Sequence, residues 1–279
     1  MCRLVAWATT KPVTLEQVIG AEQLKTLREI SHLHPDGWGA ALRVEGSPVP
    51  RIHRSTMRAG ADEDFLTVAT SWSARAGLVH LRRATSGFAV LEENTHPFTV
   101  DGWAFAHNGG IPHAERIDRI TSSRWRGRRR GDTDSERYFL ALAERIEERG
   151  DLLEGIRTSV ADIRRECGPA SMNAILLGSD VLAVIHASAR ARPPVADLLE
   201  SVGGAQDRLP RGHLDRYYDL VFRHVGGGVV VSSTGMPDES WEQLQPESVL
   251  LFDLERSTFE IVPAEATAAD ASVGAGRRS

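Results

Sequence analysis

Met1-Cys2-Arg3-Leu4-Val5-Ala6-Trp7-Ala8 opens the chain with a cysteine directly after the first methionine, and a short apolar strand follows at once. Removal of Met1 would leave a thiol and a free α-amine on the same residue. An α-amine titrates near pH ~8 and a thiol near pH ~8.5, so this amine can accept the thiol proton at neutral pH without a histidine. A protein that uses this chemistry must carry its own N-terminus into a pocket on a fixed strand.

Two simpler interpretations of Cys2 stand beside this one. Free cysteine is often buried, so Cys2 can be a residue packed under a sheet. A lipidated or secreted N-terminus would need a basic stretch and an apolar segment before Cys2, and the sequence offers neither. Other features of the sequence are needed to distinguish a packing role of Cys2 from a catalytic one.

The composition is that of a globular protein with a sizeable core, because 41% of its 279 residues are hydrophobic and 25% are charged. This length suits one large domain or two small ones. No apolar run reaches the ~18 residues that span a bilayer, and the net charge of −5 predicts no general attraction to nucleic acid. With Cys2 and Cys167 as its two cysteines, a disulfide framework is not expected. We expect a soluble, reduced, cytoplasmic protein.

The apolar pattern predicts strands at both ends of the chain and helices mainly in the middle. Helices are expected over 14–30, with a break near Gly20, and over 62–75, 134–149 and 151–166. Strands are expected over 3–9, 38–44, 49–54, 77–82, 103–106, 171–177 and 181–186, and near 217–223, 229–233, 249–254 and 258–262. Strict alternation of strand and helix is missing, which favours two packed antiparallel sheets with helices outside.

Polar groups with a possible chemical role lie at the ends of three of these elements. Arg82, at a strand end, can clamp a carboxylate with two parallel hydrogen bonds. Asn108 and Gly109 offer an amide side chain and an open backbone N–H, the parts of an oxyanion hole. Asp134, at a helix start, can cap the helix or face an ammonium group. With Cys2 as nucleophile, these groups suit an α-amino acid that carries an amide in its side chain.

Taken one at a time, these residues have ordinary structural interpretations. Arg82 can be a surface charge, Asn108-Gly109 a hairpin turn, and Asp134 a helix cap. His80, His96 and His107 can be strand histidines with satisfied hydrogen bonds. The functional interpretation rests on the combination.

As an ordered set, the stretches that carry these residues resemble the class II glutamine amidotransferases, which are N-terminal-nucleophile hydrolases. The stretches are Met1-Cys2-Arg3, Asp36-Gly37-Trp38-Gly39, His80-Leu81-Arg82-Arg83-Ala84-Thr85, Asn94-Thr95-His96-Pro97-Phe98, His107-Asn108-Gly109 and Asp132-Thr133-Asp134-Ser135-Glu136. The resemblance implies an α+β fold, a four-layer αββα sandwich of two antiparallel sheets, as one domain over residues 2–263. Residues 264–279, rich in alanine and glycine, are expected to be a disordered tail.

The resemblance also implies a reaction. Cys2 would be the nucleophile and its own α-amine the base, while Asn108 and the Gly109 amide would hold the oxyanion. Attack on the δ-carbonyl would give a γ-glutamyl thioester and release ammonia or an amine, and hydrolysis would give glutamate. No metal or other cofactor is implied.

Substrate contacts follow from the same resemblance. Arg82 would bind the α-carboxylate of glutamine, Thr85 would support it, and Asp134 would take the α-ammonium. Members linked to a synthase usually have an aromatic residue after the arginine and a histidine after the threonine, where this chain has Arg83 and Ser86. The chain looks more like the stand-alone members, including those that hydrolyse a γ-glutamyl amide in ergothioneine biosynthesis.

Several questions stay open at this level. No synthase domain is evident, so the leaving group can be ammonia for a separate synthase partner or a larger amine. The pathway, the oligomeric state and the removal of Met1 are not readable from the sequence.

Two other kinds of site compete with this interpretation. His32-Leu33-His34-Pro35-Asp36 superficially resembles the opening of a binuclear metallohydrolase, although a glycine follows the aspartate and no strand precedes it. Arg124–Arg130 holds five arginines and a tryptophan, which suits a non-enzymatic arm for nucleic acid or an acidic partner. We favour a solvated loop that forms a lid or rim at the pocket, because it leads directly to Asp134.

Overall fold

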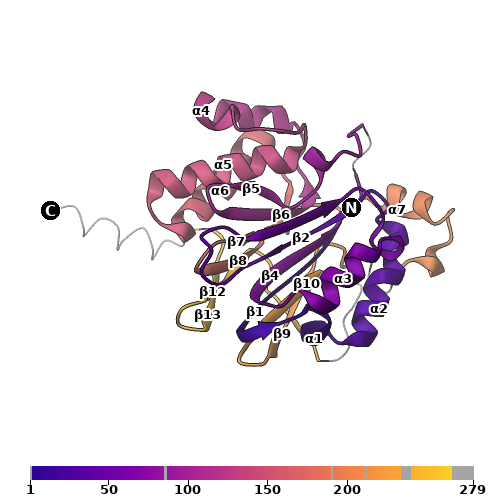
Figure 1. Ribbon diagram of the computed structural model, residues 1–279. Coiled ribbons are helices and arrows are strands. Elements are labelled where there is room, and N and C mark those ends of the chain that lie inside the picture. The colour runs from indigo at the N-terminus through magenta and orange to yellow at the C-terminus, as the bar shows by residue number, and fades with distance from the viewer. Residues whose placement is uncertain (1, 85–86, 190, 211–212, 234–239, 266–279) are drawn as a thin grey trace.

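The computed structural model describes residues 2–84, 87–189, 191–210, 213–233 and 240–265. Within these ranges, two antiparallel sheets pack face to face (Figure 1). The first sheet has the order β11-β9-β10-β1-β4-β2-β3. Its strands are β1 Arg3–Val13, β2 Trp38–Leu42, β3 Arg51–Ser55, β4 Ala74–Leu81, β9 Leu220–Val225, β10 Gly228–Ser233 and β11 Glu242–Gln243.

The second sheet has the order β13-β12-β8-β7-β6-β5. Its strands are β5 Phe98–Val100, β6 Trp103–Gly110, β7 Ser171–Leu177, β8 Val181–His186, β12 Ser248–Asp253 and β13 Thr258–Pro263. β1, which follows Cys2, is an inner strand of the first sheet between β4 and β10.

Helices cover the outer faces of both sheets. α1 Leu15–Ile19, α2 Ala21–Ile30 and α3 Glu63–Ser71 lie on the first sheet, and α5 Asp134–Arg149 and α6 Leu152–Cys167 on the second (Figure 1). α4 Ser123–Arg126 packs on α5, and α7 Val195–Ser201 lies near the N-terminus (Figure 1). The expected four-layer αββα sandwich is therefore confirmed. None of the helices in the described ranges is long and apolar enough to cross a bilayer.

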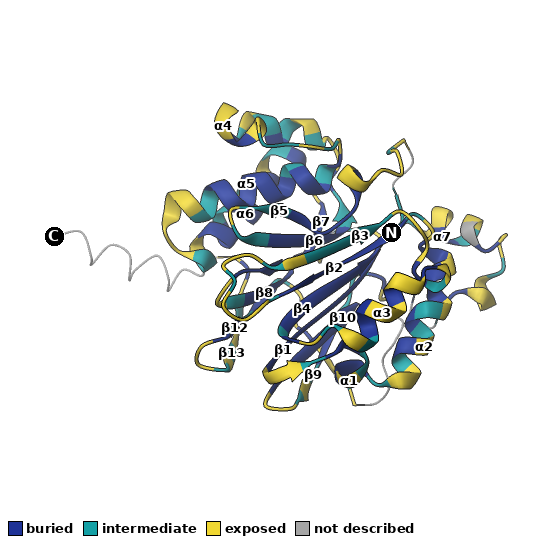
Figure 2. Ribbon diagram, in the orientation of Figure 1, coloured by how far each residue is buried: buried dark blue, intermediate teal, exposed yellow. Residues whose placement is uncertain are grey.

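Three apolar layers hold the sandwich together, and buried residues run along the inner strands of both sheets (Figure 2). Trp7 and Phe65 lie in the layer between the first sheet and its helices. Phe105 and Phe139 stack at 5.0 Å in the layer beneath α5. The layer between the sheets is built from small and aliphatic side chains, including Leu4, Ala6, Leu78, Ala104 and Ala106.

Local signals in the sequence explain the helix boundaries. Thr14 begins α1 with a capping box, because its hydroxyl accepts from the Gln17 N–H while the Gln17 side chain accepts from the Thr14 N–H. Gly20 has φ of 96°, which only glycine adopts easily, so the predicted break in this helix is confirmed. Thr133, and not Asp134, caps α5 by accepting from the Glu136 N–H at 3.1 Å.

The remaining differences from the sequence prediction are short or local. The helix expected over 62–75 ends at Ser71, because β4 begins at Ala74. β5, α4, α7 and β11 were not predicted. The tail expected over 264–279 has a buried first residue, Ala264, and residues 266–279 lie outside the described part of the chain.

Candidate active site

Strand alternation places Cys2 and Arg82 on the same face of the first sheet. Successive side chains of a strand point to opposite faces. Leu4 on β1 and Leu78 on β4 lie in the layer between the sheets. β1 and β4 pair with Arg3 opposite Leu81, so Cys2 and Arg82 are the next residues on facing strands. Both therefore face the space between the sheets, at the end where the strands stop.

The Cys2 thiol is nearly buried, at 8% exposed, and is held by the backbone of Arg83. Its Sγ accepts from the Arg83 N–H at 3.4 Å and donates to the Arg83 carbonyl at 3.6 Å. Burial raises the pKa of the thiol, while the Arg83 N–H and the Arg82 charge act in the opposite direction. Burial thus favours the protonated thiol, so Cys2 needs a nearby base to act as a nucleophile.

Arg82 is a buried cation beside the thiol, so the interpretation as a surface charge is wrong. The residue is 3% exposed, and its guanidinium donates to the carbonyls of Asp36 and Ala89, each at 3.2 Å. Burial lowers the pKa of Arg82, and Cys2 and Asp36 raise it. Two of its five N–H groups are used in these bonds.

Asn108 and Gly109 belong to β6, so the hairpin-turn interpretation is wrong. Asn108 lies on the same face of β6 as Ala104 and Ala106, toward the first sheet. Its side-chain amide is fully buried, and neither its nitrogen nor its oxygen has a hydrogen-bond partner among the described residues. A Cβ at Gly109 would collide with the Ser171 carbonyl, so glycine is needed there. The arrangement presents an unused amide where the two sheets meet.

Asp134 is fixed at the end of the strand that carries Asn108. Its Oδ2 accepts from the Ile111 N–H at 2.9 Å and its Oδ1 from the Ser135 N–H at 2.9 Å. His107 joins the same region, since its Nδ1 lies 2.8 Å from the Ser135 hydroxyl and its Nε2 2.8 Å from the Ser171 carbonyl. Asp134 lines a cavity of about 510 Å³ together with Gly110.

A second cavity, of about 750 Å³, lies on the other side of Gly110. Arg83, Gly109 and Asp36 line it, and α7 supplies Asp197 to the opposite wall. The Arg83 Nη2 donates to the Asp197 carbonyl at 3.1 Å, so the residue that holds the Cys2 sulfur also reaches α7. Sequence reasoning missed this wall, and the only signal for it is Pro193-Pro194 before the short helix.

Thr85 and Ser86 lie outside the described residues. The predicted role of Thr85 beside Arg82 stays a prediction.

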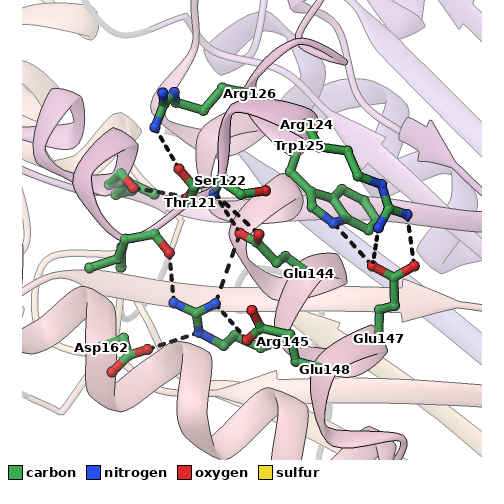
Figure 3. A network of polar contacts seen from close by, with 12 residues as sticks. Thr121, Ser122, Arg124, Trp125, Arg126, Glu144, Arg145, Glu147, Glu148 and Asp162 are labelled. Atoms are coloured by element: carbon green, nitrogen blue, oxygen red, sulfur yellow. Dashed lines mark hydrogen bonds and ion pairs between the residues drawn. The ribbon is translucent and has the colours of Figure 1, made fainter.

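The arginine-rich segment 121–131 is anchored to α5 and does not line either of these cavities. Arg124 forms two hydrogen bonds to Glu147, at 2.7 and 2.9 Å, and the Trp125 indole N–H donates to the same carboxylate at 3.2 Å (Figure 3). Arg129 pairs with Asp118 at 3.2 Å. The segment lines a separate cavity between β3 and β5, so its prediction as the rim of the pocket is wrong.

The residues of the alternative metal motif are used in local structure. The His32 ring is exposed and lies 2.7 Å from the Glu29 carbonyl, whereas His34 is buried. The Asp36 carboxylate accepts from the Ala84 N–H at 2.7 Å. Within the described ranges, no group of three or more His, Cys, Asp or Glu residues is arranged to hold a metal ion.

A central strand that begins beside a cysteine, in a sandwich of two antiparallel sheets between helices, defines the class of N-terminal-nucleophile hydrolase folds. A model of the family described as class-II glutamine amidotransferases matches residues 1–261. The chain therefore belongs to this family of enzymes, and the resemblance read from its motifs is confirmed.

Curated relatives match only part of the chain. An uncharacterized protein of Methanocaldococcus jannaschii, MJ1515, is 29% identical over 156 residues, which are 53% of this chain and 40% of that protein. The Escherichia coli K12 protein named "Putative glutamine amidotransferase YafJ" is 28% identical over 126 residues, 42% of this chain and 44% of that protein. The chain thus spans less than half the length of these relatives.

Solved structures share the fold over nearly the whole chain. A protein from Silicibacter pomeroyi described as a "glutamine aminotransferase class-II domain protein" superposes with a TM-score of 0.62 at 21% identity, covering 95% of this chain and 100% of that one. Glutamine phosphoribosylpyrophosphate amidotransferase from Bacillus subtilis gives a TM-score of 0.58 at 14% identity, covering 96% of this chain and 50% of that one.

Proposed function

We propose that the protein is an N-terminal-cysteine amidohydrolase that acts on the side-chain amide of glutamine or of a γ-glutamyl amide. The observation that carries this proposal is the buried, unpartnered amide of Asn108 on β6, which faces the layer between the sheets that Cys2 also faces. A buried amide without partners costs stability, by about 1–3 kcal/mol. A ligand oxygen that accepts from the Asn108 N–H₂ would recover part of that cost.

The proposed reaction begins when the α-amine of Cys2, free after removal of Met1, takes the thiol proton. Sγ attacks the δ-carbonyl, and Asn108 and the Gly109 N–H stabilise the oxyanion. The C–N bond breaks as the leaving nitrogen accepts the proton from the amine, which gives ammonia or an amine and a γ-glutamyl thioester. Water then adds to the thioester carbonyl, and the C–S bond breaks to release glutamate and restore the thiol.

Three side chains are proposed to hold the glutamyl end. Arg82 would bind the α-carboxylate with N–H groups not engaged by Asp36 and Ala89, Asp134 would pair with the α-ammonium, and Thr85 would support the arginine. Arg82 and Asp134 are supported by their position, since one is buried beside Cys2 and the other is fixed at the end of β6.

We expect Arg82→Lys to raise KM more than it lowers kcat. Lysine keeps the charge but loses the planar fork, and a hydrogen bond to a charged group contributes about 1.5–3 kcal/mol, or roughly ten- to a hundredfold in binding. Steady-state kinetics would measure this, with thermal unfolding to confirm that the contacts to Asp36 and Ala89 are not needed for folding. Arg83→Lys is the control. An unchanged KM in Arg82→Lys together with a strongly raised KM in Arg83→Lys would show that Arg83, and not Arg82, binds the carboxylate.

The leaving group is the part of the substrate that the second cavity would hold. Its volume of about 750 Å³ is far larger than ammonia needs, since a water molecule occupies roughly 30 Å³. Arg83 lines this cavity: its backbone N–H holds the Cys2 sulfur, and its guanidinium reaches across to the Asp197 carbonyl on α7. These features favour an amine larger than ammonia, with a charged group that Arg83 can bind.

We expect γ-glutamyl amides of bulky or charged amines to be turned over at least as well as glutamine. Arg83→Met should lower kcat/KM for an amine that carries a carboxylate by roughly tenfold or more, and for glutamine much less, because a charged hydrogen bond is lost only in the first case. Released glutamate would be measured over a γ-glutamyl series. Arg129→Met, in the segment far from this cavity, is the matched control. A strict preference for glutamine in every variant would favour ammonia donation to a separate synthase.

A further inference from the structure

His80 forms a hydrogen bond between the two sheets next to the candidate site. It lies on β4, on the face that meets the second sheet, and is fully buried. Its Nε2 is 3.2 Å from the carbonyl oxygen of His107 on β6. The surrounding layer consists of aliphatic side chains such as Leu4, Leu78 and Ala106. It is therefore a directed polar contact within a layer built largely from apolar side chains.

The direction of this hydrogen bond is fixed by chemistry. A carbonyl oxygen can only accept, so the His80 Nε2 carries the hydrogen and Nδ1 has none. Burial lowers the pKa of His80 to about 3, although the bond to His107 acts in the opposite direction, so the ring is neutral at physiological pH. Nδ1 has no hydrogen-bond partner in the described part of the chain, and the ring packs against His96 with centroids 4.2 Å apart.

This hydrogen bond connects the two sheets that carry the two parts of the candidate site, the proposed nucleophile Cys2 and the proposed oxyanion donors at Asn108 and Gly109. β1 and β4 pair Leu4 with His80 and Arg3 with Leu81, so Cys2 lies on the same face as Leu4, two residue pairs further along. The His107 carbonyl belongs to the peptide group that leads into Asn108. One side chain thus connects the strand beside the nucleophile to the backbone that presents the oxyanion donors.

We propose that His80 is a positioning residue, whose hydrogen bond to the His107 carbonyl sets the separation between the Cys2 sulfur and the Asn108–Gly109 donors. The inference rests on the proposed function. Oxyanion donors must lie within ~2.7–3.1 Å of the developing charge. Apolar packing has no direction and cannot define such a distance, whereas a hydrogen bond weakens steeply once it is bent or stretched.

Two substitutions at this position separate positioning from packing. His80→Leu is similar in size but has no donor, and we expect its kcat to fall about ten- to a hundredfold, with KM within about threefold, because a misplacement near 1 Å can cost roughly a hundredfold in rate. In His80→Gln the side-chain amide N–H₂ reaches the place of Nε2, and kcat should stay within about threefold of wild type. Should His80→Leu fail to fold, His80→Asn serves instead, because its amide is one methylene too short to reach the carbonyl.

A control variant and a second readout guard against a general loss of structure. His186 on β8 is also buried and also contacts backbone carbonyls, with Nδ1 3.0 Å from Leu244 O and 3.1 Å from Gln245 O. His186→Leu should lower the melting temperature as much as His80→Leu does, yet keep the kcat of the folded fraction. Alkylation of Cys2 by iodoacetamide, which needs no oxyanion donors, should proceed at the wild-type rate within about twofold in His80→Leu.

The outcomes are distinguishable. Wild-type protein that releases no glutamate from any γ-glutamyl compound overturns the proposed function and this inference with it. If the wild type is active, two results overturn the inference alone. One is a wild-type kcat in His80→Leu. The other is a kcat in His80→Gln as low as that in His80→Leu or His80→Asn. Equal loss of kcat in His186→Leu would assign the effect to stability and overturn it as well.

Discussion

Cys2→Ala and Cys2→Ser are expected to abolish γ-glutamyl hydrolysis while the protein stays folded. Neither replacement has a thiol, and a serine hydroxyl is too weak an acid for a neighbouring amine to activate in the same way. Among the described residues, the Cys2 sulfur has two weak hydrogen bonds, both to the Arg83 backbone at 3.4 and 3.6 Å, so its loss should remove little structure. Glutamate release and thermal unfolding of the same samples would test both parts of this expectation.

The second cysteine is a matched control. Cys167 is also buried, at 5% exposed, and its Sγ also lies 3.6 Å from a backbone carbonyl, that of His113. It ends α6, away from the face that carries Cys2, so Cys167→Ala should keep near wild-type activity. A comparable loss of turnover in both alanine variants would refute the assignment of Cys2 as nucleophile. Intact mass is part of the experiment, because retained Met1 would leave the amine acylated and the enzyme inactive.

Asn108→Ala is expected to lower kcat by about a hundred- to a thousandfold, the usual effect of removing one oxyanion donor. The same change should cost little stability, or even gain some, because the buried amide of Asn108 has no hydrogen-bond partner among the described residues and is left unsatisfied in the free protein. Kinetics together with denaturant unfolding would reveal this separation of activity from stability.

The neighbouring asparagine supplies the comparison. Asn173 pairs with Asn108 across β6 and β7, but its amide is fully used: it donates to the Tyr218 carbonyl at 2.6 Å and accepts from the Ala187 N–H at 3.1 Å and the Ser188 hydroxyl at 2.6 Å. Asn173→Ala should therefore lose stability, by about 1–3 kcal/mol, where Asn108→Ala does not. Equal destabilisation by the two substitutions would mean that the Asn108 amide has a structural role.

Strong local patterns made much of the fold predictable from the sequence. Thr14 and Gly20 fix the start and the break of the first helix pair by capping and by backbone conformation, which need no distant partner. β5, with three residues, and α7, with seven, are too short to show a clear period. The sequence also suggested a free loop around Arg124 and Arg129. In the structure this segment is held in place by ion pairs to Glu147 and Asp118.

The residues proposed for the candidate site could be predicted from the sequence, but the cavity walls and contacts around them could not. Motif order indicated Cys2, Arg82 and Asn108, and strand alternation turns each of them toward the layer between the sheets. The cavity wall at α7 and the bond from His80 to β6 depend on which segments meet in three dimensions. The sequence pattern does not specify which distant segments come into contact, so these parts could be found only in the structure.

The place of β1 in the middle of its sheet bears on the order of events during synthesis. Its partner strand β10 comes late in the chain, and the Leu4 N–H donates to the Ser233 hydroxyl at 3.1 Å. At ~5–20 residues per second, Ser233 leaves the ribosome about ten to fifty seconds after Cys2. On the proposed chemistry, Met1 must be cut away, and through that interval the N-terminus has no complete sheet to enter. On that chemistry, a processing peptidase would meet an open substrate, and the amine would be released before the pocket that is proposed to use it has formed.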